Sequence, residues 1–298
     1  MNEPKVPDRV FARASQDAES ARTVTSTPQT EHPAYRLAFQ DMDFLLREDL
    51  RPVRFQLELL KPELILDEAD IGSTFVFYGS ARIPAPDKAQ AVLDRATTPR
   101  ERTIAERLMA KSRYYDVARD LARLVSVHPC DDRGKRQFVV CSGGGPSIME
   151  AANRGAADVD AESIALNIVL PHEQAPNPYV TPRLSMQFHY FALRKMHFLL
   201  RARALAAFPG GFGTFDELFE LLTLIQTRKI NPIPVLLFGR DFWTRVVNFD
   251  ALVEEGVIAE RDLNIFTFVE TAEEGWRAVR RFYGGDDTAV PGSDPLCG

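Results

Sequence analysis

The sequence predicts an α/β fold, in which a doubly wound parallel sheet lies between two layers of helices and follows an N-terminal helical extension. Short apolar runs alternate along the chain with stretches whose apolar residues recur every three or four positions. This is the pattern of strands that alternate with helices. Strands joined in this way pair in parallel, and right-handed crossovers put helices on both faces of the sheet. Three of the apolar runs end in glycine-rich turns, and such strand ends are where these sheets bind ligands.

The main domain begins near Gly72, and its apolar runs define the expected strands. The run TFVFY is typical of a buried strand, and the long region after it has the helical period. Pro146 favours a helix start, and that helix should stop near Gly155. We expect strands at 74–78, 137–141, 163–170, 184–190, 204–208, 233–239 and 265–271, and the later helices at 191–203, after Gly213 and at 273–283.

The chain divides into four predicted segments. Residues 1–33 are rich in polar residues and proline and show no apolar period, so we expect them to be disordered. Residues 34–71 form the helical extension, whose second helical stretch should be broken by Pro52 and Pro62; its expected role is docking on the main domain or on another subunit. Residues 72–283 form the main domain, and 284–298 a flexible tail.

Composition excludes several classes of function. The 298-residue chain has a formal net charge of -6 and no basic block, which argues against a nucleic-acid partner. Neither a signal-like apolar segment at the start nor a membrane-spanning run is present, so no membrane partner is expected. Three cysteines without metal-ligand spacing suggest a reducing, cytoplasmic location and no disulfide framework. No metal site is expected.

The stretch PGGFGTFDELFE at 209–220 is the first candidate site. A helix start offers unpaired N–H groups and the positive end of a dipole, and glycines let an anion come close. We therefore expect Gly210, Gly211, Gly213 and Thr214 to bind a phosphate. The alternative is that the glycines serve tight packing alone.

Two further turns lie at strand ends. Gly79-Ser80 follows the first strand, and Gly143, Gly144 and Gly145 follow the second. Because the carboxyl ends of parallel strands share one edge of the sheet, Ser80 and the three glycines should gather beside the first candidate loop. We expect the three glycines to bind a phosphate or to let a sugar or a base approach closely.

Two charged residues have competing interpretations. Thr214 and Glu217 have the T-x-x-E spacing of a capping box, in which Glu217 would only reach back to the Thr214 N–H. Arg194, with Lys195 and Arg201 nearby, could belong to a solvated basic face. Against the first interpretation, Glu217 lies one turn from the phosphate loop, where a carboxylate is unfavourable for binding an anion and so indicates another purpose.

Together these residues resemble a known family. PGGFGTFDE fits the pattern PGGxGTxxE, the pair Arg194-Lys195 lies upstream at the expected spacing, and GSAR, SGGGPSIMEAANRGA, LPHEQAPNPY and the ending from LVEEG to IFTFVET add to the match. The chain is similar over about 72–283 to the LOG (LONELY GUY) family, and to its longer, N-terminally extended bacterial branch.

The resemblance implies a Rossmann-like fold and phosphoribohydrolase activity. Such enzymes hydrolyse the N-glycosidic bond of nucleoside 5′-monophosphates, namely cytokinin riboside 5′-monophosphates (N6-substituted AMP) and often AMP, to a free base and ribose 5-phosphate. By motif matching, Arg194 and Glu217 fall on the catalytic pair and Ser80 on a nucleotide contact. The phosphate loop is matched by Gly210, Gly211, Gly213 and Thr214. It also implies a homodimer or a higher homo-oligomer. No cofactor is expected: the family is often labelled lysine decarboxylase, but nothing marks a pyridoxal-phosphate lysine.

The sequence departs from the shorter members at three places. Glu150 stands where many have glycine, Arg203 where many have aspartate, and the segment between Ala85 and Arg107 is longer. Glu150 and Glu220 are alternative carboxylates for the reaction. The rival function is a carrier or sensor of the same fold that binds a nucleotide or a molybdenum cofactor without hydrolysis.

Overall fold

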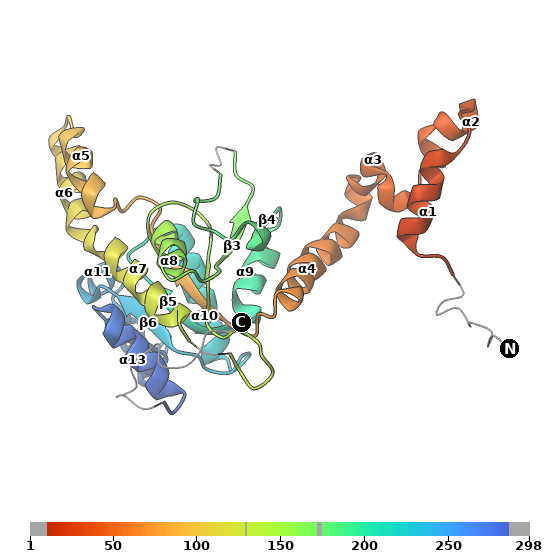
Figure 1. The fold of residues 1–298 in the computed structure, drawn as a ribbon. Coiled ribbons are helices and arrows are strands. Elements are labelled where there is room, and N and C mark those ends of the chain that lie inside the picture. The colour runs from red at the N-terminus through yellow and green to blue at the C-terminus, as the bar shows by residue number, and fades with distance from the viewer. Residues whose placement is uncertain (1–10, 129, 172–174, 286–298) are drawn as a thin grey trace. The chain divides into compact units, whose positions relative to one another are not determined.

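The computed structural model describes residues 11–128, 130–171 and 175–285, and its chain forms two compact units, 1–58 and 59–298. The second unit contains an all-parallel sheet of seven strands within the described residues, in the order β4-β3-β2-β1-β5-β6-β7 (Figure 1). The predicted α/β class with a doubly wound parallel sheet is confirmed. The strands are β1 Thr74–Tyr78, β2 Val139–Ser142, β3 Ile164–Ile168, β4 Ser185–Phe188, β5 Ala202–Ala207, β6 Val235–Phe238 and β7 Phe266–Val269.

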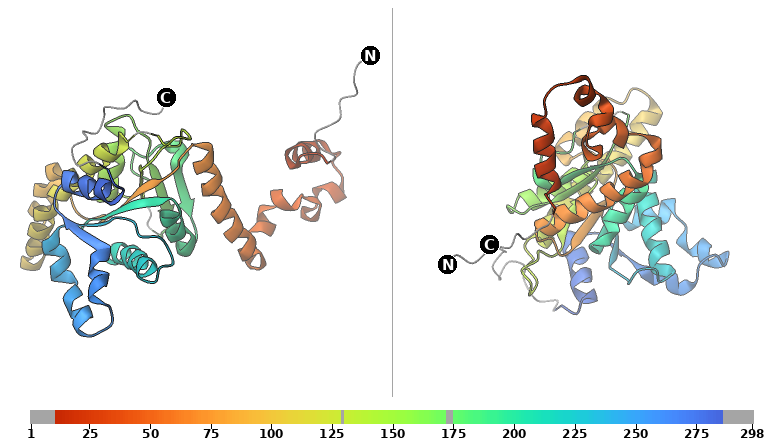
Figure 2. Two further views of the ribbon diagram at one scale, coloured as in Figure 1. Left: turned by 90° about the horizontal axis from the view of Figure 1, so that it is seen from below. Right: turned by 90° about the vertical axis from the view of Figure 1, so that its right-hand side faces the viewer.

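Helices cover both faces of this sheet (Figures 1 and 2). Successive residues of a strand point to opposite faces, so Phe75 and Phe77 of β1 pack in one apolar cluster and Val76 and Tyr78 in the other. The first cluster contains residues of α7, α8 and α13, and the second contains residues of α9, α10, α11 and α12. The helices of this unit are α5 Pro86–Asp94, α6 Pro99–Lys111, α7 Arg113–Ser126, α8 Ile148–Ala157, α9 Phe191–Leu200, α10 Phe212–Gln226, α11 Arg240–Val246, α12 Phe249–Glu254 and α13 Ala272–Phe282.

The order of the strands creates the switch point that positions the site. The chain runs outward from β1 through β2 and β3 to β4, then returns to β5 on the other side of β1 and continues to β6 and β7. The carboxyl ends of β2, β1 and β5 therefore lie next to one another. Ligands of open parallel sheets bind at such a reversal.

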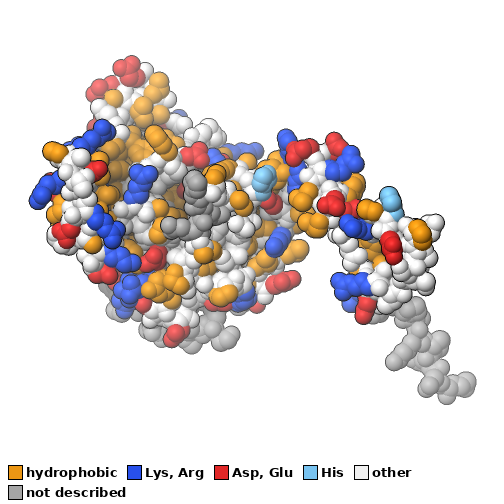
Figure 3. Space-filling model, turned by 90° about the horizontal axis from the view of Figure 1, so that it is seen from above, with side chains coloured by type: hydrophobic (Ala, Val, Ile, Leu, Met, Phe, Trp, Pro, Cys, Tyr) orange, Lys and Arg blue, Asp and Glu red, His pale blue; other side chains and the backbone are white. Residues whose placement is uncertain are grey.

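The N-terminal unit differs from the sequence-based expectation. Its described part contains α1 Ala14–Ser20 and α2 Pro28–Glu31, in the segment 1–33 whose composition predicted disorder, and α3 Met42–Leu45, in the predicted helical extension. None of these helices buries a residue. Local hydrogen bonds form them instead, as at α2, where Thr27 accepts from the Thr30 N–H. Large apolar side chains stay exposed here, part of them visible as orange patches in Figure 3.

The helix α4 Arg51–Glu68 contradicts the predicted break at Pro52 and Pro62, because it is continuous. Pro52 occupies the first turn, where a missing N–H costs nothing. Pro62 is tolerated inside the helix because tertiary contacts hold that part: Leu66 is buried in a core cluster, and Arg201 donates to a carboxylate oxygen of Glu63 at 2.9 Å. Residues 1–10 and 286–298 of the predicted disordered segment and tail lie outside the described residues.

Two further expectations concern the compartment. In the described part of the chain, no helix is both long and apolar enough to cross a membrane. Cys141 on β2 is a free, buried thiol. Cys130 is disulfide-bonded, a single cross-link that the expectation of no disulfide framework did not include.

Candidate functional site

Three glycine-rich turns meet at the carboxyl ends of β2, β1 and β5. Gly143–Gly145 follow β2, Gly79 and Ser80 follow β1, and Gly210–Gly213 follow β5. Two adjoining cavities open at this edge, with volumes of about 710 and 800 Å³. Both are lined by Gly79, Ala81, Arg82, Met149, Gly213 and Thr214.

The phosphate-loop prediction falls on the start of α10. Gly211 is the N-cap residue, and the first helical hydrogen bond runs from the Phe215 N–H to the Gly211 oxygen at 3.0 Å. The N–H groups of residues 212–214 therefore precede the intrahelical bonds and are available to an anion at the positive end of the helix dipole. Gly213 and Thr214 line both cavities and Gly211 lines the larger one.

Thr214 is not the helix cap that its spacing suggested. It is the third residue of α10, and Gly211 in front of it makes no side-chain cap bond, so the capping-box interpretation is wrong. The side chain of Thr214 is buried against Gly210, where an added Cβ would lie 2.1 Å from Thr214 Oγ1. Gly210 lines neither cavity. Packing against Thr214 therefore explains why position 210 is a glycine.

Glu217 points at Arg194 instead of the helix start. Glu217 Oε1 lies 3.3 Å from Arg194 Nη1, and the two side chains are 12% and 11% exposed. Arg194 Nε also donates to the Leu166 carbonyl at 2.8 Å, and its guanidinium lies 5.1 Å from the centre of the Phe198 ring. The alternative of a solvated basic face is therefore wrong for Arg194. The neighbouring Lys195 does form ion pairs at the surface, with Asp216 and Glu220 of α10.

Burial sets the protonation of Glu217. Removal from water raises the pKa of Glu217 from 4.5 to about 7, and the positive charge of Arg194 offsets only part of that rise. Burial, together with the negative charge of Glu217, also raises the pKa of Tyr78 well above its ordinary value. A carboxyl group with a pKa near 7 can hold or release a proton at neutral pH, which is the property that general acid–base chemistry requires.

The second glycine loop supports Arg194. A Cβ added at Gly143 would lie 2.8 Å from Arg194 Nη2, so a larger residue would require the guanidinium to move from this position. Gly144 has a φ of +74°, in the left-handed region that favours glycine. Gly143, Gly144 and Gly145 all line the cavity of about 710 Å³ together with Arg194 and Glu217. The loop therefore forms part of the cavity wall and also sets the position of the cation.

Sequence reasoning missed the side chain that fixes this loop. Asn177 Nδ2 donates to the carbonyl oxygens of Gly144 and Gly145 at 3.2 and 3.1 Å, and to Asn153 Oδ1 at 2.9 Å. Ser142 Oγ joins the same buried network by donating to Asn153 Oδ1 at 2.8 Å. The one available signal was the position of Asn177 in the quoted motif LPHEQAPNPY, between two prolines.

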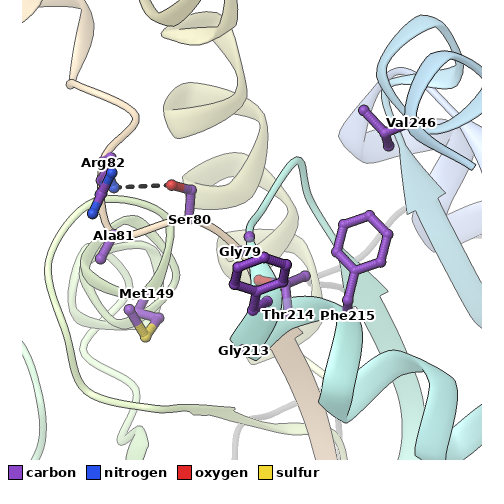
Figure 4. Close-up of a pocket in the computed structure, with 11 residues that line it drawn as sticks. Gly79, Ser80, Ala81, Arg82, Met149, Gly213, Thr214, Phe215 and Val246 are labelled. Atoms are coloured by element: carbon purple, nitrogen blue, oxygen red, sulfur yellow. Dashed lines mark hydrogen bonds between the residues drawn. The ribbon is translucent and has the colours of Figure 1, made fainter.

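Ser80 and Arg82 lie along the larger cavity (Figure 4). The Arg82 N–H donates to Ser80 Oγ at 3.0 Å, which stabilises the turn after β1. Arg82 was not singled out from the sequence, yet it lines both cavities and supplies a positive charge there. Its presence in the quoted GSAR motif was the available signal.

The alternative carboxylates lie outside the two cavities. Glu150 Oε1 accepts a hydrogen bond from the Tyr115 hydroxyl at 2.8 Å, and Glu220 pairs with Lys195 at 3.1 Å. Neither residue lines the cavity that contains Arg194 and Glu217. Among the described residues, no group of three or more His, Cys, Asp or Glu side chains is placed to hold a metal ion.

Comparisons with known proteins show which families and enzymes the chain is similar to. Residues 149–279 match the family model described as possible lysine decarboxylase. The chain is 29% identical over 168 residues to the cytokinin riboside 5′-monophosphate phosphoribohydrolase LOG4 of Arabidopsis thaliana, covering 55% of this chain and 73% of the relative. It is 32% identical over 116 residues to the pyrimidine/purine nucleotide 5′-monophosphate nucleosidase of Escherichia coli K12, covering 36% of this chain and 25% of that protein.

Among the solved structures similar to this chain is the X-ray structure of a structural genomics target, with a TM-score of 0.44 and 20% identity. The match covers 70% of this chain and 99% of that one. The family assignment depends on the sequence matches. The motifs from Gly79 to Thr214 and these sequence matches agree: the chain is similar to the LOG family.

Proposed function

We propose that the chain hydrolyses the N-glycosidic bond of adenosine 5′-monophosphates, either AMP or N6-substituted AMP, to a free base and ribose 5-phosphate. The observation that supports this most directly is the buried pair of Arg194 and Glu217, in a cavity whose wall also includes the start of α10. The names of the relatives point to nucleoside 5′-monophosphates as substrates.

Each element of the cavity has a part in this reaction. The N–H groups of residues 212–214 and the helix dipole bind the 5′-phosphate, so that binding energy positions C1′ of the ribose. Breaking the bond from C1′ to the base nitrogen builds positive charge on the ribose. The Glu217 carboxylate stabilises that charge or takes the proton of the attacking water. Arg194 holds the carboxylate in place through the contact at 3.3 Å.

The family model's description as possible lysine decarboxylase does not fit this cavity. None of the described residues that line either cavity is a lysine, and Lys195 is engaged by Asp216 and Glu220 at 3.1 Å each. A decarboxylase of this kind requires a lysine that forms a Schiff base with its cofactor. Hydrolysis by a carboxylate needs only the groups that are present.

The test is incubation with AMP, N6-isopentenyl-AMP and other nucleoside monophosphates, followed by chromatography of the released base. We expect Glu217→Gln to lose about 10²- to 10⁴-fold in turnover while still binding AMP. The matched control is Glu220→Gln on the same helix, which should keep its turnover because Glu220 faces Lys195 outside the cavity.

Three results would count against the proposal. If Glu217→Gln turned over AMP as fast as the wild type, Glu217 would not take part in the reaction. Binding of AMP by the wild-type protein without release of adenine would instead favour the rival function, a carrier or sensor that binds nucleotides without hydrolysis. Cadaverine production from lysine would favour the decarboxylase.

A further inference from the structure

A separate cavity of about 420 Å³ lies between α6, the start of α7 and α11, three helices that lie close together in Figure 1. It contains none of the residues assigned to the reaction. Val246, at the end of α11, lines both this cavity and the larger of the two site cavities. The volume falls in the range of about 300–1,000 Å³ that small-molecule sites occupy.

Positive side chains dominate the lining of this cavity. Four cations, Arg107, Lys111, Arg113 and Arg245, face a single carboxylate, that of Asp241. Arg113 is compensated by Glu270, which lies 3.0 Å from it. Across the residues that the structure describes, Arg107, Lys111 and Arg245 take part in no ion pair. The net charge of the chain is -6, so this positive cavity is a local feature of an otherwise acidic protein.

The cations are close enough to destabilise one another. Partial burial lowers the pKa of Lys111, and the positive charges of Arg107 and Arg245 lower it further. The Lys111 ammonium donates to the Arg107 carbonyl at 2.9 Å, which holds it beside the other two cations. An anion bound among these three groups would replace mutual repulsion by attraction. Arginine and lysine side chains are also the groups that bind phosphate oxygens best.

We propose that this cavity binds a small phosphate-bearing anion, separately from the substrate. The three cations supply hydrogen-bond donors from two helices, Arg107 and Lys111 from α6 and Arg245 from α11. The half-buried ring of Phe242 adds an apolar wall beside them. Because the site shares no catalytic residue with the cavity of Arg194 and Glu217, it does not depend on the proposed hydrolysis.

The test uses the reactivity of Lys111 as a local probe. The neutral form of a lysine amine is the one that reacts with amine reagents, and the lowered pKa of Lys111 favours that form. The full-length protein is labelled with and without inorganic pyrophosphate, and the modified lysines are quantified by mass spectrometry. We expect pyrophosphate to slow the labelling of Lys111 several-fold and to leave Lys229, an exposed lysine elsewhere on the surface, unchanged. This readout distinguishes the cavity from the phosphate loop, where pyrophosphate can also bind.

A matched pair of variants completes the experiment. Arg245→Gln should weaken the protection of Lys111 and keep hydrolysis of AMP, whereas Arg228→Gln, which alters an exposed arginine outside the cavity, should change neither. The proposal is overturned if Lys111 is labelled at the same rate with and without pyrophosphate. It is also overturned if sodium chloride of equal ionic strength protects Lys111 as well, or if Arg245→Gln is protected like the wild type.

Discussion

The ionised side chain of Glu217 should lower the stability of the fold, and Glu217→Gln should remove that cost. In the folded protein the pKa of Glu217 rises from 4.5 to about 7 because the carboxyl group is buried. The folded state therefore binds a proton more tightly than the unfolded chain does. Between pH 4.5 and 7 the folded state holds more protons, so the free energy of unfolding falls as the pH rises through this interval.

The size of the effect follows from the two pKa values. The rise of the pKa from 4.5 to about 7 means that ionised Glu217 lowers the free energy of unfolding by at most about 3 kcal/mol at neutral and higher pH. Between pH 5 and pH 8 the wild-type protein should lose about 2–3 kcal/mol of stability that Glu217→Gln does not lose. For a domain of this size, 1 kcal/mol corresponds to about 2–4 °C in Tm.

The assay is thermal unfolding of the wild type, Glu217→Gln and the control Glu220→Gln at pH 5 and pH 8. Removing the carboxylate also leaves Arg194 without its partner, but Arg194 stays charged at both pH values and its effect on the carboxylate is already contained in the pKa of Glu217. We expect the Tm of Glu217→Gln minus that of the wild type to increase by about 4–12 °C from pH 5 to pH 8. An equal difference at the two pH values would refute the reasoning that burial raises this pKa.

Three further predictions concern catalysis and the loops. First, because the ionised form of Glu217 is the active one, kcat/KM for AMP should fall as the pH drops below about 7; a profile that stays flat from pH 6 to pH 8 would contradict this. Second, Gly143→Ala puts a methyl group 2.8 Å from Arg194 and should lower kcat by about tenfold or more. At Gly213→Ala the added methyl group meets open space, so this variant should change mainly KM. Steady-state kinetics of both variants checks this. Third, Asn177→Ala removes the side-chain donor of the Gly145 carbonyl and leaves the Gly144 carbonyl with only the backbone N–H of residue 177. It should cost about 1–3 kcal/mol in urea unfolding, and unchanged stability would show that the network is dispensable.

The strands could be predicted because their signal is local. The five residues of β1, Thr74–Tyr78, are all buried and apolar or aromatic except the first, and a continuous apolar run of that length is typical of a central parallel strand. The convergence of the glycine turns could also be predicted, because it follows from topology. The path of α4 through Pro62 could not, because it depends on contacts with Arg201, a residue 139 positions away in the chain.

The role of Arg194 likewise could not be predicted from local sequence alone. Arg194 and Arg201 lie seven residues apart and have similar surroundings in the sequence. In the structure, Arg194 extends to the Leu166 carbonyl and beside the glycine loop, whereas Arg201 pairs with Glu63 of α4. What separates them is the space left by Gly143, a residue from another strand end. Such a contact cannot be read from spacing within one helix, so motif resemblance was needed to choose Arg194.

The spacing of Thr214 and Glu217 was ambiguous for a definable reason. In a capping box the cap and its partner stand at positions i and i+3. The same interval also puts two residues on one face of a helix that has already begun. The start of α10 decides between these cases, and it lies at Gly211. On the helix so defined, Thr214 and Glu217 face the same cavity. The first turn can then bind a phosphate and the second can present a carboxylate to the sugar attached to that phosphate, so one helix supplies both the anchor and the reacting group of the proposed hydrolysis.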